Sequence, residues 1–331
     1  MMLLDSCFLI YVICITAFTP RAPHEGHPEY LNVFFHLDNL ENSLILEDVF
    51  LMENQIPFKI LMDLITSRYD NGEELVSKFL QISAWIKFDE QRHEDIKQQL
   101  KESPPLHLLE ALRTVFVWDK TSASLEQLAQ NYIDEQGNVD VLKHEKTFRS
   151  AKDLKAKGIH FRSSSRKSFK AINFKSFTFY GQLELPSSYV SNLLKVTFLN
   201  LIAYELCQNN PVDLTVISYV TFMKSLIVGP AHVKELREKR ILLTSWTDED
   251  VVRFYKDLDT FDFGGIDIYM YVKQKIQEHY DSKAKTWMAE LFNTYFSSPW
   301  SIIAWVGAVF VLVLTVLQTY FTINPRSDSR Q

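Results

Sequence analysis

The sequence predicts a mainly α-helical domain with one small antiparallel β element (α+β), followed by a single transmembrane helix near the C-terminus. Three observations support this prediction. Apolar residues recur at helical spacing along most of the chain. Aromatic and polar residues alternate in short runs between about 159 and 186, which is typical of strands. The stretch 301–323 contains 23 residues without a charge, enough to cross a bilayer as a helix.

The overall composition excludes several classes of protein. Of the 331 residues, 47% are hydrophobic and 23% are charged, so the chain is expected to fold around a sizeable core. The net charge of −6 disfavours nucleic acid as a partner. Three cysteines do not form a disulfide framework, and no Asn is followed two residues later by Ser or Thr. We therefore expect most of the chain to face the cytosol.

The C-terminal apolar run has the properties of a membrane anchor. Trp300 and Trp305 stand near one end and Tyr320 near the other, as in the aromatic belts at bilayer surfaces. We predict a juxtamembrane linker over 291–299, a transmembrane helix over 300–323 that contacts the lipid bilayer, and a polar tail over 324–331. A buried core helix is the alternative. The flanking charges do not determine the orientation, and the sequence does not distinguish plasma membrane from endomembrane.

The N-terminal apolar run, 3–19, is ambiguous. Asp5 interrupts it, no Lys or Arg precedes it, and its length is marginal for a membrane span. From pattern alone it is a signal, an anchor or a buried helix of the domain. Between the two apolar runs, helical spacing is evident at about 42–53, 57–69, 73–86, 90–101, 106–117 and 123–133.

Helix boundary signals become clear after residue 148. Ser150 and Thr247 each precede an Asp by three residues, which predicts two N-terminal caps. Gly158 is placed to end the helix that Ser150 begins, and Pro230 suits a first helical position. Helical patterns continue from about 187 to the end of the domain near 290.

Motifs for established chemistry are missing from the sequence. Its nine glycines form neither a dinucleotide fingerprint nor a phosphate-binding loop, and there is no nucleophile elbow or zinc-protease helix. His24 and His27 form a close histidine pair but lack an ordered acidic partner. We therefore predict no cofactor and no metal.

Two acidic residues in apolar surroundings are the candidate catalytic groups. Glu53 follows the apolar stretch VFLM, and Glu205 lies within FLNLIAYELC. A buried carboxylate is costly unless it is paired, and catalytic acids are often found in such settings. The two residues are either an acid–base pair or structural groups satisfied by nearby polar side chains, namely Asn54, Gln55, Asn200 and Tyr204.

The stretch ENQIP predicts a joint between two helices. Pro57 has no N–H and restricts the residue before it, so the preceding helix must end or kink there. Glu53, Asn54 and Gln55 carry the donors and acceptors that the freed backbone groups need. The sequence thus predicts a hydrogen-bonded joint in which Pro57 begins the second helix.

Several ordered segments resemble a known family. The segments MMLLDSCFLI, LEDVFLMENQIPFKIL, FRSAKDLKAKGIHF, FLNLIAYELC and SYVTFMKSLI precede a C-terminal span, an arrangement similar to the plant family called domain of unknown function 247. In that family the first segment is internal. The resemblance therefore implies that this chain is N-terminally truncated and that 3–19 is a helix of the domain. Because YVICITAF is apolar, contact of this segment with a membrane remains an alternative.

The resemblance carries over no catalytic residue, cofactor or substrate. Some grass members are linked to pollen self-incompatibility, which implies recognition of a partner at a membrane. The expected function is recognition or signalling through an unidentified protein partner. The rival hypothesis is a hydrolase- or transferase-type enzyme that uses Glu53 or Glu205. A pocket joining these two carboxylates would favour the enzyme, and separate, hydrogen-bonded carboxylates would favour the recognition protein.

Overall fold

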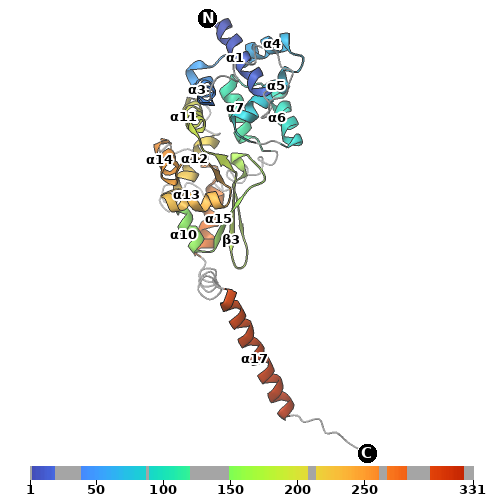
Figure 1. The fold of residues 1–331 in the computed structure, drawn as a ribbon, viewed down its shortest axis with the longest axis vertical. Helices are drawn as coiled ribbons and strands as arrows, with labels where there is room; N and C mark the ends of the chain where they lie inside the picture. The colour runs from blue at the N-terminus through green and yellow to red at the C-terminus, as the bar shows by residue number, and fades with distance from the viewer. Residues whose placement is uncertain are drawn as a thin grey trace, which may run out of the picture.

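The computed structural model describes residues 2–18, 39–86, 89–119, 149–207, 214–260, 267–281 and 299–323. It confirms the predicted fold class, because helices dominate the described residues and short strands form one small sheet and one strand pair. The body is elongated, and α17 (Pro299–Ile323) extends away from the end opposite the N-terminus (Figure 1). The expected helix at 123–133 and the pair His24 and His27 lie outside the described residues.

The N-terminal half of the body is built from helices (Figure 1). They are α1 (Met2–Phe18), α3 (Asn39–Val49), the 3-10 turn η2 (Met52–Asn54), α4 (Phe58–Arg68), α5 (Gly72–Ser83), α6 (Glu90–Glu102) and α7 (Leu108–Val117). The predicted helix at 42–53 therefore ends earlier than expected, because η2 and an extended stretch separate α3 from α4.

Helix α1 is part of the core. Leu9, Val12 and Ile13 are buried in the main hydrophobic cluster, and the helix packs against α5 and α4. In the described structure α1 therefore packs as one of the helices of the body.

The small sheet lies in the C-terminal half of the body. It follows α10 (Ala151–Ala156) and contains β1 (Ile159–Ser163), β2 (Asn173–Ser176) and β3 (Gly181–Leu185) in the order β1-β3-β2. Strands β2 and β3 form the expected antiparallel hairpin, but β1 pairs with β3 in parallel. The sheet is therefore mixed. The reason is that the chain crosses through η3 (Phe169–Ala171) before β2, which places β3 in the centre.

Further helices complete the described body, and α15 packs against β2 of the sheet. They are α11 (Asn192–Cys207), α12 (Thr215–Leu226), α13 (Pro230–Glu238), α14 (Asp248–Asp257) and α15 (Met270–Asp281). A second, unexpected pair of parallel strands joins β4 (Ser188–Tyr189) to β5 (Leu242–Leu243).

The predicted helix signals are confirmed. The Asp153 and Asp250 amides donate to the hydroxyls of Ser150 and Thr247, respectively. Gly158 has a φ of 75°, in the left-handed region, and α13 begins at Pro230.

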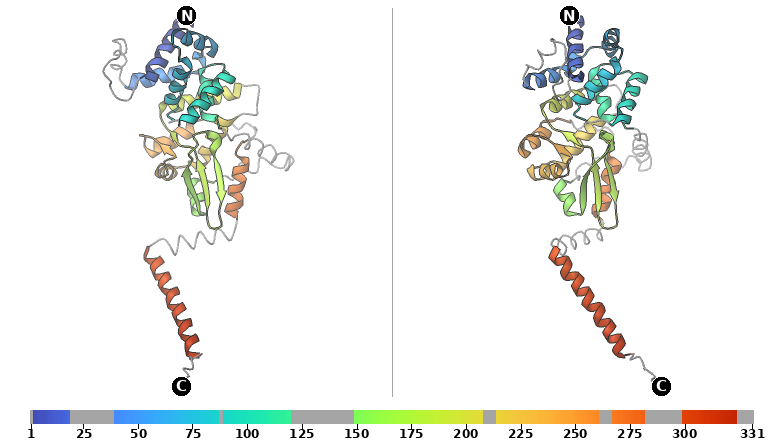
Figure 2. Two further views of the ribbon diagram at one scale, coloured as in Figure 1. Left: turned by 90° about the vertical axis from the view of Figure 1, so that its right-hand side faces the viewer. Right: turned by 45° about the vertical axis from the view of Figure 1, so that its right-hand side comes forward.

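Stacked aromatic rings connect the two halves of the body. Phe169 of η3 lies between Phe116 of α7 and Tyr219 of α12, with ring centroids 4.9 and 3.9 Å away. Phe198 of α11 meets the same rings edge-on or tilted. Helix α11 also contacts α3, η2, α7 and α12. It is therefore the central element on which the candidate site is built (Figure 2).

Helix α17 has the length and composition of a membrane span. Its window 303–320 is uncharged and none of it is buried in the body. A core helix of a soluble protein would be mostly buried, so exposure favours the single-pass anchor. Most of the expected linker, 291–298, and the tail 324–331 lie outside the described residues.

Candidate functional site

The Glu205 carboxylate lies at a junction of three helices. Its Oε1 accepts from Nε of Arg113 on α7 at 2.8 Å and lies 2.7 Å from a second guanidinium nitrogen. The backbone amides of Val216 and Ile217 donate to Oε1 and Oε2, each at 3.0 Å. Glu205 is 2% exposed. Its two oxygens are thus occupied by an ion pair and by the first turn of α12.

Two opposing effects act on the pKa of the Glu205 carboxyl group. Burial raises the pKa of Glu205, and Arg113 together with the α12 amides opposes that rise. The amides at a helix N-terminus carry partial positive charge and lack intrahelical partners, so a carboxylate there satisfies them. Glu205 therefore caps α12 and connects it to α7.

Sequence reasoning missed Arg113 as the partner of Glu205. A detectable signal was available, because Arg113 is a cation within the largely apolar segment LLEALRTVFV. A buried cation requires a counter-charge.

At ENQIP the chain makes a hydrogen-bonded turn between α3 and α4, with Gln55 as its main described side chain. Its Nε2 donates to the carbonyls of Val49 at 2.9 Å and Leu51 at 2.7 Å, and its Oε1 accepts from the Leu109 amide at 2.9 Å. One side chain thus satisfies the end of α3, the turn η2 and the beginning of α7. Pro57 precedes the first residue of α4, and the following Phe58 amide donates to the Leu106 carbonyl at 2.8 Å.

Two asparagines complete this joint. Asn54 donates from Nδ2 to the Asp48 carbonyl at 3.0 Å. Asn200 of α11 accepts from the Met52 amide through Oδ1 at 2.8 Å and donates to the Val196 carbonyl. The central helix thereby holds η2 in place.

Glu53 is not buried, contrary to the sequence-based expectation. It lies in η2 and is exposed to solvent. The reason is local geometry: η2 is a single turn on the surface, and none of its residues is buried. The charges paired with Glu205 come from Arg113 and α12, so the described contacts of Glu205 do not include Glu53.

Tyr204 lies beside the junction and contacts the entrance of α7. Its ring meets the His107 ring edge-on, with centroids 5.1 Å apart. His107 Nδ1 accepts from the Glu110 amide at 3.2 Å and so caps α7. Burial lowers the pKa of His107, which favours the neutral ring that this cap requires.

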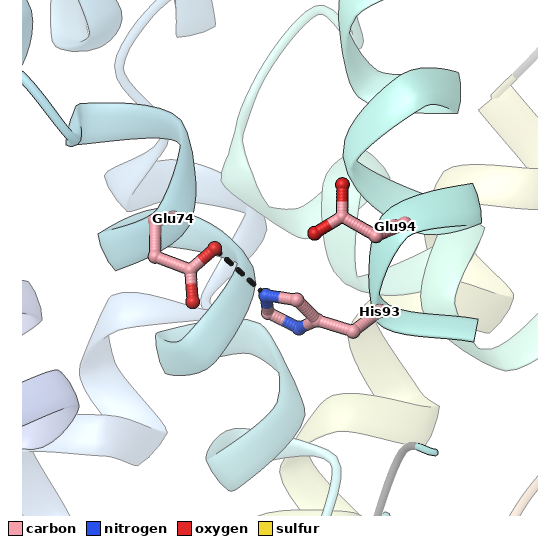
Figure 3. Close-up of side chains that lie close together, drawn as sticks. All are labelled: Glu74, His93 and Glu94. Carbon is pink, nitrogen blue, oxygen red and sulfur yellow. Dashed lines mark hydrogen bonds and ion pairs between the residues drawn. The ribbon is translucent and has the colours of Figure 1, made fainter. Parts of the chain in front are cut away.

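A second cluster of polar side chains connects α5 and α6. Glu74, His93 and Glu94 bring three possible metal ligands together (Figure 3). His93 Nε2 lies 2.9 Å from Oε2 of Glu74, and its Nδ1 lies 3.3 Å from the Ser77 hydroxyl. Neither acid was singled out from the sequence, because Glu74 is one of two acids in the first turn of α5 and Glu94 lies on the mostly polar helix α6.

The carboxylates of this cluster already form ion pairs with lysines. Lys78 and Lys97 lie 3.1 and 3.2 Å from Glu74, and Lys97 also pairs with Glu94. Burial raises the pKa of Glu74, but hydrogen bonds from His93, Lys78 and Lys97 outweigh it and lower the pKa to about 2. A divalent cation would have to displace these ammonium groups.

Ser77, His93 and Glu74 are the residue types of a nucleophilic triad, but the serine is not accessible. Ser77 is 0% exposed, so no substrate can reach its hydroxyl. The arrangement therefore serves to connect α5 to α6.

A cavity of about 240 Å³ lies between the start of α11 and α14. Charged, aromatic and amide side chains line it, namely Asn192, Lys195, Trp246, Asp250, Arg253, Phe254 and Asp257. Lys195 pairs with Asp257 at 3.0 Å and Arg253 with Asp250 at 3.3 Å, so its charges are internally matched. Neither Glu53 nor Glu205 lines this cavity.

An exposed aromatic patch lies where the two halves of the body meet. Trp85, just after α5, is 51% exposed and stacks on Tyr189 of β4 with centroids 4.4 Å apart. In the β4–β5 register Tyr189 is paired with Leu243, which is 44% exposed. Trp85 has a φ of 52°, an uncommon conformation for a bulky residue. We call Trp85, Tyr189 and Leu243 the aromatic patch.

The fold and the junction define a mainly helical α+β protein whose buried carboxylate has a full set of structural partners, with a C-terminal helix able to cross a membrane. The family model described as plant protein of unknown function, DUF247, matches residues 1–314. The chain belongs to this family.

Two relatives from Arabidopsis thaliana are similar to it. UPF0481 protein At3g47200 is 25% identical over 341 residues, covering 96% of this chain and 66% of that protein. Putative UPF0481 protein At3g02645 is 24% identical over 184 residues, covering 54% of this chain and 34% of that protein. The chain thus spans less than two thirds of the length of each relative. No solved structure matches.

Proposed function

We propose that this chain is a membrane-anchored recognition protein that acts through contacts with another protein, with its body in the cytosol and α17 in the bilayer. The aromatic patch is the observation that carries the proposal. Tryptophan and tyrosine are enriched at binding hot spots because they bury large areas at a small entropy cost. An exposed indole held at positive φ is the kind of local strain that persists at functional positions.

The position of the patch supports recognition rather than chance exposure. Trp85 belongs to the N-terminal half, whereas Tyr189 and Leu243 belong to the strands of the C-terminal half. A partner bound there would contact both halves at once.

The rival enzymatic function receives less support. It would use Glu53 or Glu205. Glu205, however, makes four described contacts with other protein groups, and Glu53 is not one of those groups. Glu53 itself is exposed to solvent. A general acid must reach its substrate, and a 2% exposed carboxylate does not.

The test is proximity labelling in plant tissue with the full chain and matched surface variants. We expect Trp85→Ala and Leu243→Ser each to remove the same defined set of neighbours while the protein stays in the membrane fraction. Ile60→Ser, which removes a 41% exposed apolar residue from α4, serves as the control.

Two outcomes would contradict the proposal. An unchanged set of neighbours in both patch variants would exclude the aromatic patch as the recognition surface. Loss of biological activity in Glu205→Gln with full stability and unchanged neighbours would instead favour the enzyme.

A further inference from the structure

The turn between β2 and β3 exposes three aromatic rings in four residues. Phe177 is 40% exposed, Phe179 51% and Tyr180 39%. The Phe177 amide donates to the Tyr180 carbonyl at 2.8 Å, and the two rings stack with centroids 4.7 Å apart. So much exposed aromatic surface at a hairpin tip is unfavourable in water unless something covers it.

This tip lies at the end of the body from which the chain continues to α17. Ser176, the last residue of β2, lies 2.9 Å from His279 near the end of α15. Strand β2 also packs along α15. In both views of Figure 2, as in Figure 1, the hairpin tip points toward the side where α17 lies.

Cationic side chains flank the same end. The Gly181 amide donates to the Gly158 carbonyl at 3.0 Å, which places the end of α10 beside the aromatic turn. Lys157 and Arg149 lie 5.3 and 4.4 Å from the ring of Tyr280 on α15. Aromatic rings next to lysine and arginine are the combination found at the surface of anionic bilayers.

From these observations we infer that the β2–β3 tip is a membrane-contact site. Phe177, Phe179 and Tyr180 enter the headgroup region, and Lys157 and Arg149 meet anionic lipid. This inference rests on the proposed membrane anchor. It adds that the body has a defined orientation on the bilayer.

Because α17 holds the body near the bilayer, the hairpin tip needs only a weak affinity for lipid to contact it. Residues 282–298 separate α15 from α17 and reach at most about 60 Å when fully extended. A hairpin tethered so close to the bilayer meets it at a high effective concentration, so three rings need not bind membranes on their own.

The test uses the full chain in lipid nanodiscs, with Cys7 and Cys207 replaced by Ser and the buried Cys14 retained. An environment-sensitive fluorophore is attached through Thr178→Cys at the tip, Ser67→Cys on α4, or Val313→Cys within α17. Emission and quenching by nitroxide-labelled lipid are compared in phosphatidylcholine with and without phosphatidylserine.

We expect the label at 178 to be blue-shifted and quenched, more so with phosphatidylserine, and the label at 67 to remain in water. Phe177→Ser combined with Phe179→Ser should abolish the quenching at 178. Leu106→Ser, which removes a 69% exposed side chain elsewhere, should not.

The controls separate this inference from the proposed anchor. If the label at 313 is quenched while that at 178 resembles the label at 67, the tip does not touch lipid and the inference is wrong. If the label at 313 is not quenched, the anchor itself fails. Shielding of 178 only when membrane proteins are added would overturn the inference and assign the tip to a protein partner.

Discussion

The Glu205 carboxylate and the Arg113 guanidinium form a buried ion pair between helices 92 residues apart in sequence. The pair does not stand alone, since two amides of α12 donate to the same carboxylate. Three helices thus meet at one polar point inside an otherwise apolar core. Both charges are buried, so this arrangement makes the ion pair important for the stability of the fold.

Removing one member of this pair should destabilise the protein strongly. Glu205→Ala removes the carboxylate that Arg113 and two α12 amides share, and breaking a buried ion pair in this way costs about 3–5 kcal/mol. We expect a large decrease in the chemical-denaturation midpoint of the detergent-solubilised full chain.

A double-mutant cycle with Arg113→Met isolates the pair itself. The double variant should be less destabilised than the sum of the single variants, because neither charge is then left alone. Strict additivity would show that the two side chains do not interact.

The ENQIP joint should depend on Gln55 and tolerate changes at Glu53. Gln55→Ala removes the donor to the Val49 carbonyl and the acceptor of the Leu109 amide, each loss costing about 1–3 kcal/mol if the group stays buried and unpaired. The Leu51 carbonyl loses one of its two donors and keeps the Asn54 amide. Glu53→Ala changes an exposed side chain and should alter the free energy of unfolding by no more than about 0.5 kcal/mol. Thermal unfolding of both variants would reveal the difference, and equal losses would contradict the assignment.

Glu74 should make stability depend on pH in the acidic range. Its pKa in the folded chain is about 2, below its ordinary value of 4.5. The ionised form is therefore favoured by folding, so its contribution is present above pH 4.5 and is lost as the pH falls toward 2. Glu74→Gln should flatten the dependence of melting temperature on pH in this window. A parallel shift at every pH would point to packing alone.

Deleting 300–331 should release the protein from membranes. The window 303–320 is the apolar segment of the described chain long enough to span a bilayer. Alkaline-washed membranes should retain the full chain and lose the deletion variant. Retention of the variant would indicate a second membrane contact, with α1 and the hairpin tip as the candidates.

Orientation can be tested with a new glycosylation acceptor. Glu73→Thr creates the sequence Asn-Gly-Thr at Asn71, which is exposed in the turn before α5. A cytosolic body should yield no glycosylated product in plant cells. A product sensitive to glycosidase would place the body in the secretory lumen.

Much of the fold was predictable because its signals are local. Hydrophobic spacing located the helices, and short-range hydrogen bonds at Ser150 and Thr247 marked where two of them begin. The uncharged length of 301–323 identified the anchor candidate for the same reason, since bilayer thickness acts on consecutive residues. Pro57 and Gln55 indicated the joint, because a proline restricts its own neighbourhood in the chain.

The sequence by itself determined which residues need a partner, and only the tertiary structure decided which partner each receives. Glu205 required compensation wherever it was buried, but its pairing with Arg113 depends on the crossing of α7 and α11. Glu53 occurs in a similar apolar context, yet a single surface turn leaves it in water. Burial is a property of the packed chain, so two acids with similar neighbours in sequence have opposite environments.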